Sequence, residues 1–347
     1  MVMIELMLTT NPGVEDLLAE EVSLKLRAHI TMIKHNYGRV FTRIHEDYLY
    51  ALDYLRGMNK AYLVLGRDQV CPRRSCLKEI YNLVHSTSIH EYTSKLDKFA
   101  VRVERVGNHE YTSLDIAKVV GDAVRDSVRN KKGHDIRVDL DYPSFVVSIN
   151  VIEDEILILL ELGEFSRHQR GYRIYEHPAS LSPVLAYALL ILSNVRDSEL
   201  ILDPMCGGGT IAIEAALLLE NAGIYCMDKS VKHINGAEIN AKAALVHNRI
   251  RFLIGDATNL SYYFKTVDNV ITNPPYGIRL GRPSLIRPLY QKFVSSLAKI
   301  VRKKVAIITT EYQFLEEQLS KAGWAIVHTR RVMHGNLYPH IVIAEPT

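Results

Sequence analysis

The chain has 347 residues, of which 48% are apolar, and a formal net charge of +3. This length exceeds what one hydrophobic core usually serves, so two or three domains are expected. The chain lacks a run of about 18 apolar residues and is not expected to span a membrane, and so small a net charge gives no support for binding nucleic acid through bulk charge.

Residues 1–72 predict a small α+β domain. Residues 4–10 are apolar and read as a strand, and the turn NPG separates them from a helix over 14–26 with apolar residues at helical spacing. Two short strands, around 31–34 and 38–44, and a helix around 46–57 complete the unit.

Residues 73–163 predict a second α+β domain. Ser113 is a plausible cap for the longer of its two helices, because apolar residues recur at helical spacing directly after it. The expected helices are residues 76–86 and 111–130, and the expected strands are residues 99–107, 135–143, 145–154 and 155–163. Residues 164–180 have little periodicity, which is typical of a linker.

From residue 181 to residue 347 short apolar strands alternate with helices, which predicts a doubly wound, mostly parallel sheet of the Rossmann-like class. The expected strands are 200–205, 223–230, 250–257, 267–277, 304–311 and two terminal strands, and the expected helices are 184–195, 210–220, 231–247, 285–301 and 311–323. Such sheets bind ligands beyond the carboxyl ends of their strands, so every motif at a strand end is expected on one rim.

The first of these motifs is CGGGT, residues 206–210, between a strand and a helix. Glycines allow a sharp bend and a close approach to a ligand, and the helix that follows presents free N–H groups. The pattern Gly207-x-Gly209-x-x-Ala212 fits the dinucleotide fingerprint, although a purely structural turn is the alternative.

Acidic residues end the neighbouring strands. Asp228 follows the glycines by about 20 residues, which suits the hydroxyls of a ribose. Asp256, in the sequence GDA, could meet the exocyclic amine of an adenine. Each acid alone could be a cap or turn residue, but their order along the chain favours a nucleoside cofactor. Asp203, four residues before the glycines, suits the ammonium group of S-adenosylmethionine, whereas NAD is the competing cofactor.

The sequence NPPY, residues 273–276, follows an apolar strand. An aromatic amine must rehybridise toward tetrahedral to accept a methyl group, and acceptors on its two hydrogens stabilise that change. Asn273 offers a side-chain oxygen and Pro274 a carbonyl, which Pro274 and Pro275 hold in place because their rings fix φ. Tyr276 offers a flat face for a flipped base. These four residues are the predicted catalytic set, without a general base.

DPMCGGGT, CMD, GDA and NPPYG in this order resemble the amino-group methyltransferases of the Rossmann-like class that use S-adenosylmethionine. The motif NPPY occurs in enzymes of that class acting on adenine N6, guanine N2 and glutamine. The resemblance implies a cofactor site formed by Asp203, Pro204, Cys206, Gly207, Gly209, Thr210, Asp228, Asp256, Ala257 and Asn273.

The front half resembles a THUMP domain preceded by a ferredoxin-like domain, on the residues SLDIAKVVGDAVRDSV, IRVDLDYPSFVVSINVIEDEILILLELGEFSRHQRGYR and TTNPGVEDLLAEEV. With the GIRLG and LYQKF segments, this implies a THUMP-containing RNA guanine-N2 methyltransferase, most similar to the archaeal tRNA enzymes acting on guanine 6. In that family the front domains grip the 3′ CCA end. Relatives acting on guanine 10 tend to carry Asp at the first NPPY position, so Asn273 favours guanine 6, although ribosomal RNA enzymes also carry Asn.

Basic residues in local clusters are the candidate RNA contacts, and the alternative for each is an ordinary solvated surface position. They are Arg73, Arg74, Lys131, Lys132, Arg170, Arg173, Arg279 and Arg282. The expected partner is tRNA, and the expected state is a monomer.

Three other functions stay open beside guanine-10 tRNA or ribosomal RNA methylation. One is an N6-adenine DNA methyltransferase, which has no need of a THUMP-like front half. The second is an inactive RNA-binding module, which needs no intact NPPY. The third is an NAD oxidoreductase, which has no use for NPPY at a strand end. The four cysteines are too few for a disulfide framework, and Cys71 and Cys76 have no second pair to form a zinc site. Free or buried thiols, no metal and a cytoplasmic location are therefore expected.

Overall fold

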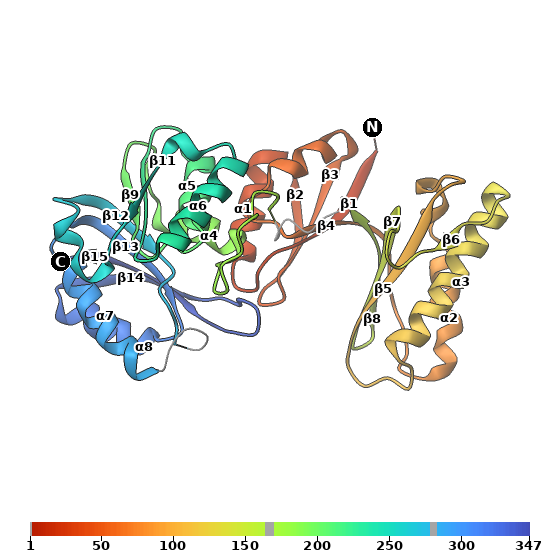
Figure 1. Cartoon of the computed structure of the whole chain (residues 1–347). Helices are drawn as coiled ribbons and strands as arrows, with labels where there is room; N and C mark the ends of the chain where they lie inside the picture. The colour runs from red at the N-terminus through yellow and green to blue at the C-terminus, as the bar shows by residue number, and fades with distance from the viewer. Residues whose placement is uncertain (1, 164–169, 278–282) are drawn as a thin grey trace.

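The computed structural model describes residues 2–163, 170–277 and 283–347, which form two bodies that are each built on one β-sheet. Figure 1 shows the C-terminal body at one end of an elongated molecule, the first α+β unit in the middle and the second at the other end. The front half therefore forms an arm that extends from the C-terminal body.

The N-terminal unit has the predicted order of elements, with one difference. It comprises β1 (Met3–Thr9), α1 (Glu15–Leu26), β2 (His29–Lys34), β3 (Arg39–His45), η1 (Glu46–Tyr54) and β4 (Lys60–Gln69). The helix expected over 46–57 is the 3-10 helix η1. Its buried residues, Ala51 and Leu52, are adjacent and form no stripe at α-helical spacing, so packing does not favour a full α-helix.

The second unit carries two helices on one side of its strands. It comprises η2 (Arg74–Cys76), α2 (Leu77–Ser86), η3 (Ser88–Tyr92), β5 (Lys98–Val106), α3 (Ser113–Lys132), β6 (Arg137–Val138), β7 (Phe145–Ile152) and β8 (Glu155–Leu162). The cap of α3 is Thr112, whereas Ser113, the predicted cap, is the first helical residue. Thr112 has extended backbone and shares reciprocal hydrogen bonds with Asp115, which make a capping box.

One sheet runs through both front units. Its strand order is β2-β3-β1-β4-β8-β7-β5-β6, and the long strands β4 and β8 pair antiparallel from Ala61–Leu162 to Gln69–Glu155. The apolar clusters lie around α1 and η1 in one unit and around α2 and α3 in the other. Because a backbone ladder joins the two units, the arm is continuous.

The structure corrects the expectation for two of the four cysteines. Cys71 and Cys76 form a disulfide that closes the turn between β4 and α2. The turn is also held by the hydroxyl of Tyr111, which donates to the carbonyl of Cys71 at 3.0 Å. Cys206 and Cys226 are free and buried, as expected. With one pair oxidised, cysteine usage no longer argues for a reducing compartment.

The C-terminal body is the predicted doubly wound sheet, with strand order β11-β10-β9-β12-β13-β15-β14. Only β15 runs antiparallel to the others among the described strands. Its strands are β9 (Leu200–Asp203), β10 (Gly223–Asp228), β11 (Ile250–Ile254), β12 (Val267–Thr272), β13 (Val301–Thr309), β14 (Trp324–Arg331) and β15 (His340–Pro346). Its helices are α4 (Pro183–Ser193), α5 (Thr210–Leu218), α6 (Val231–Ala243), η5 (His247–Arg249), η6 (Ala257–Tyr262), α7 (Pro283–Leu297) and α8 (Tyr312–Lys321). Helices α4–α6 cover one face and α7–α8 the other.

The start of α1 packs against the C-terminal body. Val14 and Leu17 join the same apolar cluster as residues of α4 and α5. The backbone N–H of Met333 donates to the carbonyl of Pro12 at 2.9 Å. Gly13 has φ +98°, and a Cβ atom there would lie 2.4 Å from the carbonyl oxygen of Arg331. Close backbone contact at this interface therefore requires glycine.

No described helix combines the length and the apolar character needed to cross a membrane.

Candidate active site

A cavity of about 840 Å³ lies beyond the carboxyl ends of β9, β10 and β12. The glycine loop, the three strand-end acids and NPPY all border it, as expected from parallel strands. The predicted site residues that line it are Asp203, Pro204, Cys206, Gly207, Thr210, Asp228, Asp256, Ala257, Asn273, Pro274, Pro275 and Tyr276.

Glycines shape the loop between β9 and α5 in two different ways. Gly207 has φ +52° and lines the cavity, where its N–H donates to Asp228 Oδ2 at 3.0 Å. Gly209 has φ +79° and caps α5, and a Cβ atom there would lie 2.9 Å from Cβ of Ala237. Gly209 is not among the residues that line the cavity and packs against α6, so the structure gives its predicted cofactor contact no support.

The carboxyl group of Asp203 is buried at the end of β9, where the residue is 2% exposed. Its Oδ1 accepts hydrogen bonds from Thr272 Oγ1 at 2.7 Å and from the N–H of Met205 at 3.3 Å. Burial, with a smaller contribution from Asp228, raises the pKa of Asp203 to about 7, although these hydrogen bonds oppose the shift. A buried acid of this kind is a good partner for a positively charged ligand group.

Asp228 connects the glycine loop with the start of α6. Besides the bond to Gly207, its Oδ1 accepts from the N–H of Ser230 at 2.9 Å and lies 3.2 Å from His233 Nδ1. Asp228 therefore both faces the cavity and fixes the loop. A substitution at this position will disturb both roles.

Asp256 caps the short helix η6 and is exposed at the cavity. Its Oδ1 accepts from both the N–H and the hydroxyl of Thr258 at 2.8 Å. The backbone hydrogen bond from Thr258, followed by the side-chain bond, lowers the pKa of Asp256, so the group is a carboxylate at neutral pH.

Asn273 carries an acceptor that no described residue satisfies. Its Nδ2 donates to the carbonyl of Ala179 at 3.3 Å, and its Oδ1 is buried without a partner. A buried unsatisfied acceptor costs about 1–3 kcal/mol, so a donor from a ligand is expected there. This is the observation that best fits a target amine.

Helix α7 supports Pro275 of NPPY through a hydrogen bond from Tyr290. The hydroxyl of Tyr290 donates to the carbonyl of Pro275 at 3.3 Å and lies 2.8 Å from Thr309 Oγ1. The hydroxyl of Tyr276 is buried without a partner among the described residues, and burial raises the pKa of Tyr276. Tyr276 is therefore protonated at neutral pH.

Apart from Arg173, sequence reasoning missed the part of the site that comes from the predicted linker. The backbone of Tyr175 forms two hydrogen bonds with the side chain of Asn240, at 2.7 and 3.0 Å, and Asn240 also donates to the carbonyl of Gly208 at 2.9 Å. The ring of His177 lies against Gly207 and packs edge-on against His233, with centroids 4.4 Å apart. Other lining residues outside the predicted set include Met205, Lys229, Thr258, Lys292 and Leu337.

The candidate RNA contacts that the structure describes lie in different parts of the molecule. Arg73, Arg74 and Lys131 are exposed on the second unit, where Arg74 lies 3.7 Å from Asp115, and Lys132 donates to the carbonyl of Thr93 at 2.6 Å. Arg173 lines the cavity. Arg279 and Arg282 lie outside the described residues.

The prediction for Arg170 is corrected. Its side chain is 11% exposed and its Nε lies 3.2 Å from Glu214 Oε1, inside the molecule rather than on a surface open to RNA. A guanidinium group so close to a buried carboxylate compensates the charge of that carboxylate and is not available to bind a phosphate.

Comparisons with known proteins agree with this geometry. Residues 170–340 match the family described as RMKL-like, methyltransferase domain, and residues 75–161 match the THUMP domain. The chain is 32% identical to a tRNA (guanine(6)-N2)-methyltransferase of Methanocaldococcus jannaschii over 96% of this chain and 97% of that protein. It is 31% identical to the enzyme of the same name from Archaeoglobus fulgidus, over 96% and 90% of the two chains. The crystal structure of TrmN from Thermus thermophilus covers both chains fully with a TM-score of 0.86 and 30% identity.

Proposed function

Because the chain belongs to the family of the tRNA (guanine(6)-N2)-methyltransferases, we propose that it methylates the exocyclic N2 of guanosine 6 in the acceptor stem of tRNA. The observation that supports this chemistry best is the buried, unpartnered Oδ1 of Asn273, which borders the same cavity as the strand-end acids. The exposed Arg73, Arg74 and Lys131 on the THUMP unit are suited to phosphate contacts.

The residues around the glycine loop fit S-adenosylmethionine. When bound, this cofactor supplies a methyl group on a positively charged sulfur. Asp203 would hold its ammonium group, Asp228 its ribose hydroxyls and Asp256 its adenine amine. The N–H of Gly207 already donates a hydrogen bond to the carboxylate of Asp228. The pyrophosphate of NAD would need such N–H groups and would meet a negative charge at this loop, so NAD fits less well.

Asn273 and the two prolines prepare the target amine. The amine would donate hydrogen bonds to Asn273 Oδ1 and to the carbonyl of Pro274. These two bonds favour a tetrahedral nitrogen and stabilise the positive charge that develops on it. Tyr290 holds the next carbonyl, that of Pro275, so the corner is fixed before the substrate arrives.

Tyr276 would stack against the flipped guanine. Base stacking on an aromatic ring contributes about 1–3 kcal/mol. Since burial raises its pKa, the hydroxyl stays protonated and does not act as a general base. The site therefore works by orientation and electrostatics, and the proton leaves after methyl transfer.

The test is to incubate the protein with labelled S-adenosylmethionine and unmodified tRNA, and then to digest the RNA and identify the labelled nucleoside and its position. We expect N2-methylguanosine at position 6. A matched tRNA with inosine at position 6 lacks only the amine and should take no label there. Label in adenosine, or equal label in the inosine tRNA, would contradict the proposal.

A further inference from the structure

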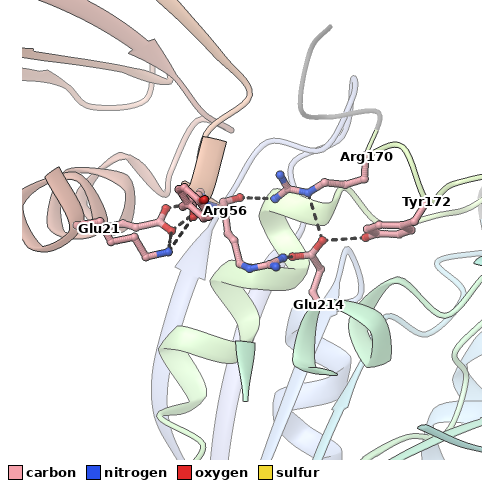
Figure 2. Close-up of polar contacts among 8 residues, drawn as sticks. Glu21, Arg56, Arg170, Tyr172 and Glu214 are labelled. Atoms are coloured by element: carbon pink, nitrogen blue, oxygen red, sulfur yellow. Dashed lines mark hydrogen bonds and ion pairs between the residues drawn. The ribbon is translucent and has the colours of Figure 1, made fainter. Parts of the chain in front are cut away.

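Glu214 is a fully buried carboxylate on α5 and does not line the cavity that NPPY borders. Its Oε1 accepts from the hydroxyl of Tyr172 at 2.8 Å and from Arg170 Nε at 3.2 Å, and its Oε2 accepts from Arg56 Nη1 at 2.7 Å. Figure 2 shows the two guanidinium groups and the tyrosine converging on this one side chain. Arg56 belongs to the arm and Glu214 to the C-terminal body, so the ion pair crosses between them.

A second buried acid holds the same loop from the arm's side. Glu21 on α1 accepts from the N–H of Arg56 and from the N–H of Gly57, both at 2.8 Å. Arg170 Nη2 donates to the carbonyl of Arg56 at 2.7 Å. Glu21, Arg56, Arg170, Tyr172 and Glu214 are called the clamp below (Figure 2).

The clamp joins two elements with different tasks. Arg56 lies in the loop before β4, and β4 pairs along its length with β8 of the THUMP unit. Glu214 lies about one turn into α5, the helix that begins at the glycine loop. A rotation at the clamp would therefore change the position of the far end of the arm, where α3 lies, relative to the cavity (Figure 1).

Buried ion pairs require a specific geometry. A charge inside the molecule is tolerated only while its partners stay within hydrogen-bond distance, so removal of one partner leaves an uncompensated charge. Among the described residues, the other ion pair across this interface joins Arg330 and Asp16 at 2.6 Å, and Asp16 is about half exposed. Exposed pairs of that kind define an angle only weakly.

We propose that Glu214, with Arg56 and Arg170, positions the tRNA-binding arm at one angle to the catalytic body and thereby selects the nucleotide that reaches Asn273. This inference rests on the proposed function for its substrate. These three are positioning residues, since none of them borders the cavity.

The test compares Glu214→Gln and Arg56→Met with a matched control, Glu199→Gln. Glu199 is also a buried acid, bound by Lys303 and Asn269 at 2.7 Å, but all of its partners lie within the C-terminal body. We expect the two clamp variants to lose about tenfold or more in kcat/KM at the target guanosine and to gain label at neighbouring guanosines, because small misplacements of a substrate are costly. Affinity for S-adenosylhomocysteine should stay within about twofold, because no cofactor contact changes.

Glu199→Gln should lower the melting temperature without moving the label. If Glu214→Gln fails to fold, Arg56→Met still tests the proposal. It is expected to fold because Glu214 keeps its bonds to Arg170 and Tyr172. A folded Arg56→Met protein with the wild-type distribution of label would overturn the proposal.

A second readout needs no RNA and separates this inference from the proposed function. Spin labels attached through Lys131→Cys on the arm and Lys242→Cys on the body, both exposed positions, report the distance between the two. We expect a narrow distribution of distances in the otherwise wild-type protein and a broader one with Arg56→Met. An unchanged distribution overturns the positioning role even if tRNA is methylated as proposed, whereas absence of tRNA methylation by the wild type refutes the proposed function alone.

Discussion

The hydroxyl of Tyr290 on α7 donates a hydrogen bond to the carbonyl oxygen of Pro275 at 3.3 Å. The ring is fully buried, and the same hydroxyl lies 2.8 Å from Thr309 Oγ1 at the end of β13. The corner formed by the two prolines is thus fixed by a neighbouring helix and a neighbouring strand in addition to its own ring geometry.

Tyr290→Phe should therefore lower turnover more than cofactor affinity. A single neutral hydrogen bond is worth about 1 kcal/mol, so we expect kcat to fall by about fivefold to tenfold. Single-turnover kinetics with tRNA and calorimetry with S-adenosylhomocysteine measure the two effects. Tyr262→Phe, which changes a highly exposed tyrosine, is the control and should match the wild type. Equal losses in affinity and rate would show that the bond supports the cavity as a whole.

Asn273→Ala should remove the unpartnered acceptor with little effect on the cofactor. Loss of one such charge-stabilising group typically costs about 100- to 1,000-fold in kcat. Asn273→Asp is the paired variant, since it keeps an acceptor oxygen but cannot donate to the carbonyl of Ala179. Its rate should fall between those of Asn273→Ala and the wild type. If cofactor affinity drops as much as the rate, Asn273 does not act on the amine alone.

Asp228→Asn should weaken S-adenosylmethionine. The substitution keeps the shape of the side chain but replaces one acceptor oxygen. It also removes the negative charge of the group that accepts from the N–H groups of Gly207 and Ser230 and contacts His233. Hydrogen bonds to a charged group are worth about 1.5–3 kcal/mol, which corresponds to a loss in affinity of about tenfold to a hundredfold.

Calorimetry at constant pH measures the affinity of this variant, and circular dichroism shows whether the fold is intact. A folded Asp228→Asn protein that binds the cofactor as tightly as the wild type would remove Asp228 from the ribose site.

Cofactor affinity should depend on pH through Asp203. Burial raises the pKa of this carboxyl to about 7 from its ordinary 3.8, so the folded state holds a proton that the unfolded state releases. The contribution of Asp203 to stability is therefore fully present below pH 3.8 and is lost as the pH rises through about 7. An ammonium group requires the carboxylate, so affinity should rise with pH up to about 7, by at most about tenfold per pH unit.

Asp203→Asn provides the control for this titration. Its affinity should be lower than that of the wild type and nearly independent of pH between 5.5 and 7.5, a range of about two units around the pKa of Asp203. A wild-type affinity that stays flat over the same range would exclude Asp203 as the partner of the ammonium group.

The sequence by itself predicted which residues gather at the cavity. The acids Asp203 and Asp228 end two strands and the amide Asn273 follows a third, and parallel strands bring their carboxyl ends to one edge whatever the details of packing. Periodicity likewise predicted the doubly wound C-terminal sheet, because a strand covered on both faces must be apolar throughout.

Only the tertiary structure decided what the remaining polar groups contact. Arg170 lies in a segment without periodicity and meets Glu214 44 residues later, and Arg56 meets the same carboxylate across 158 residues. The pairing of β4 with β8 and the contact of Asn240 with the linker are of the same kind. Local patterns report which face of an element is apolar, whereas the partner of a buried charge depends on how whole elements pack against one another.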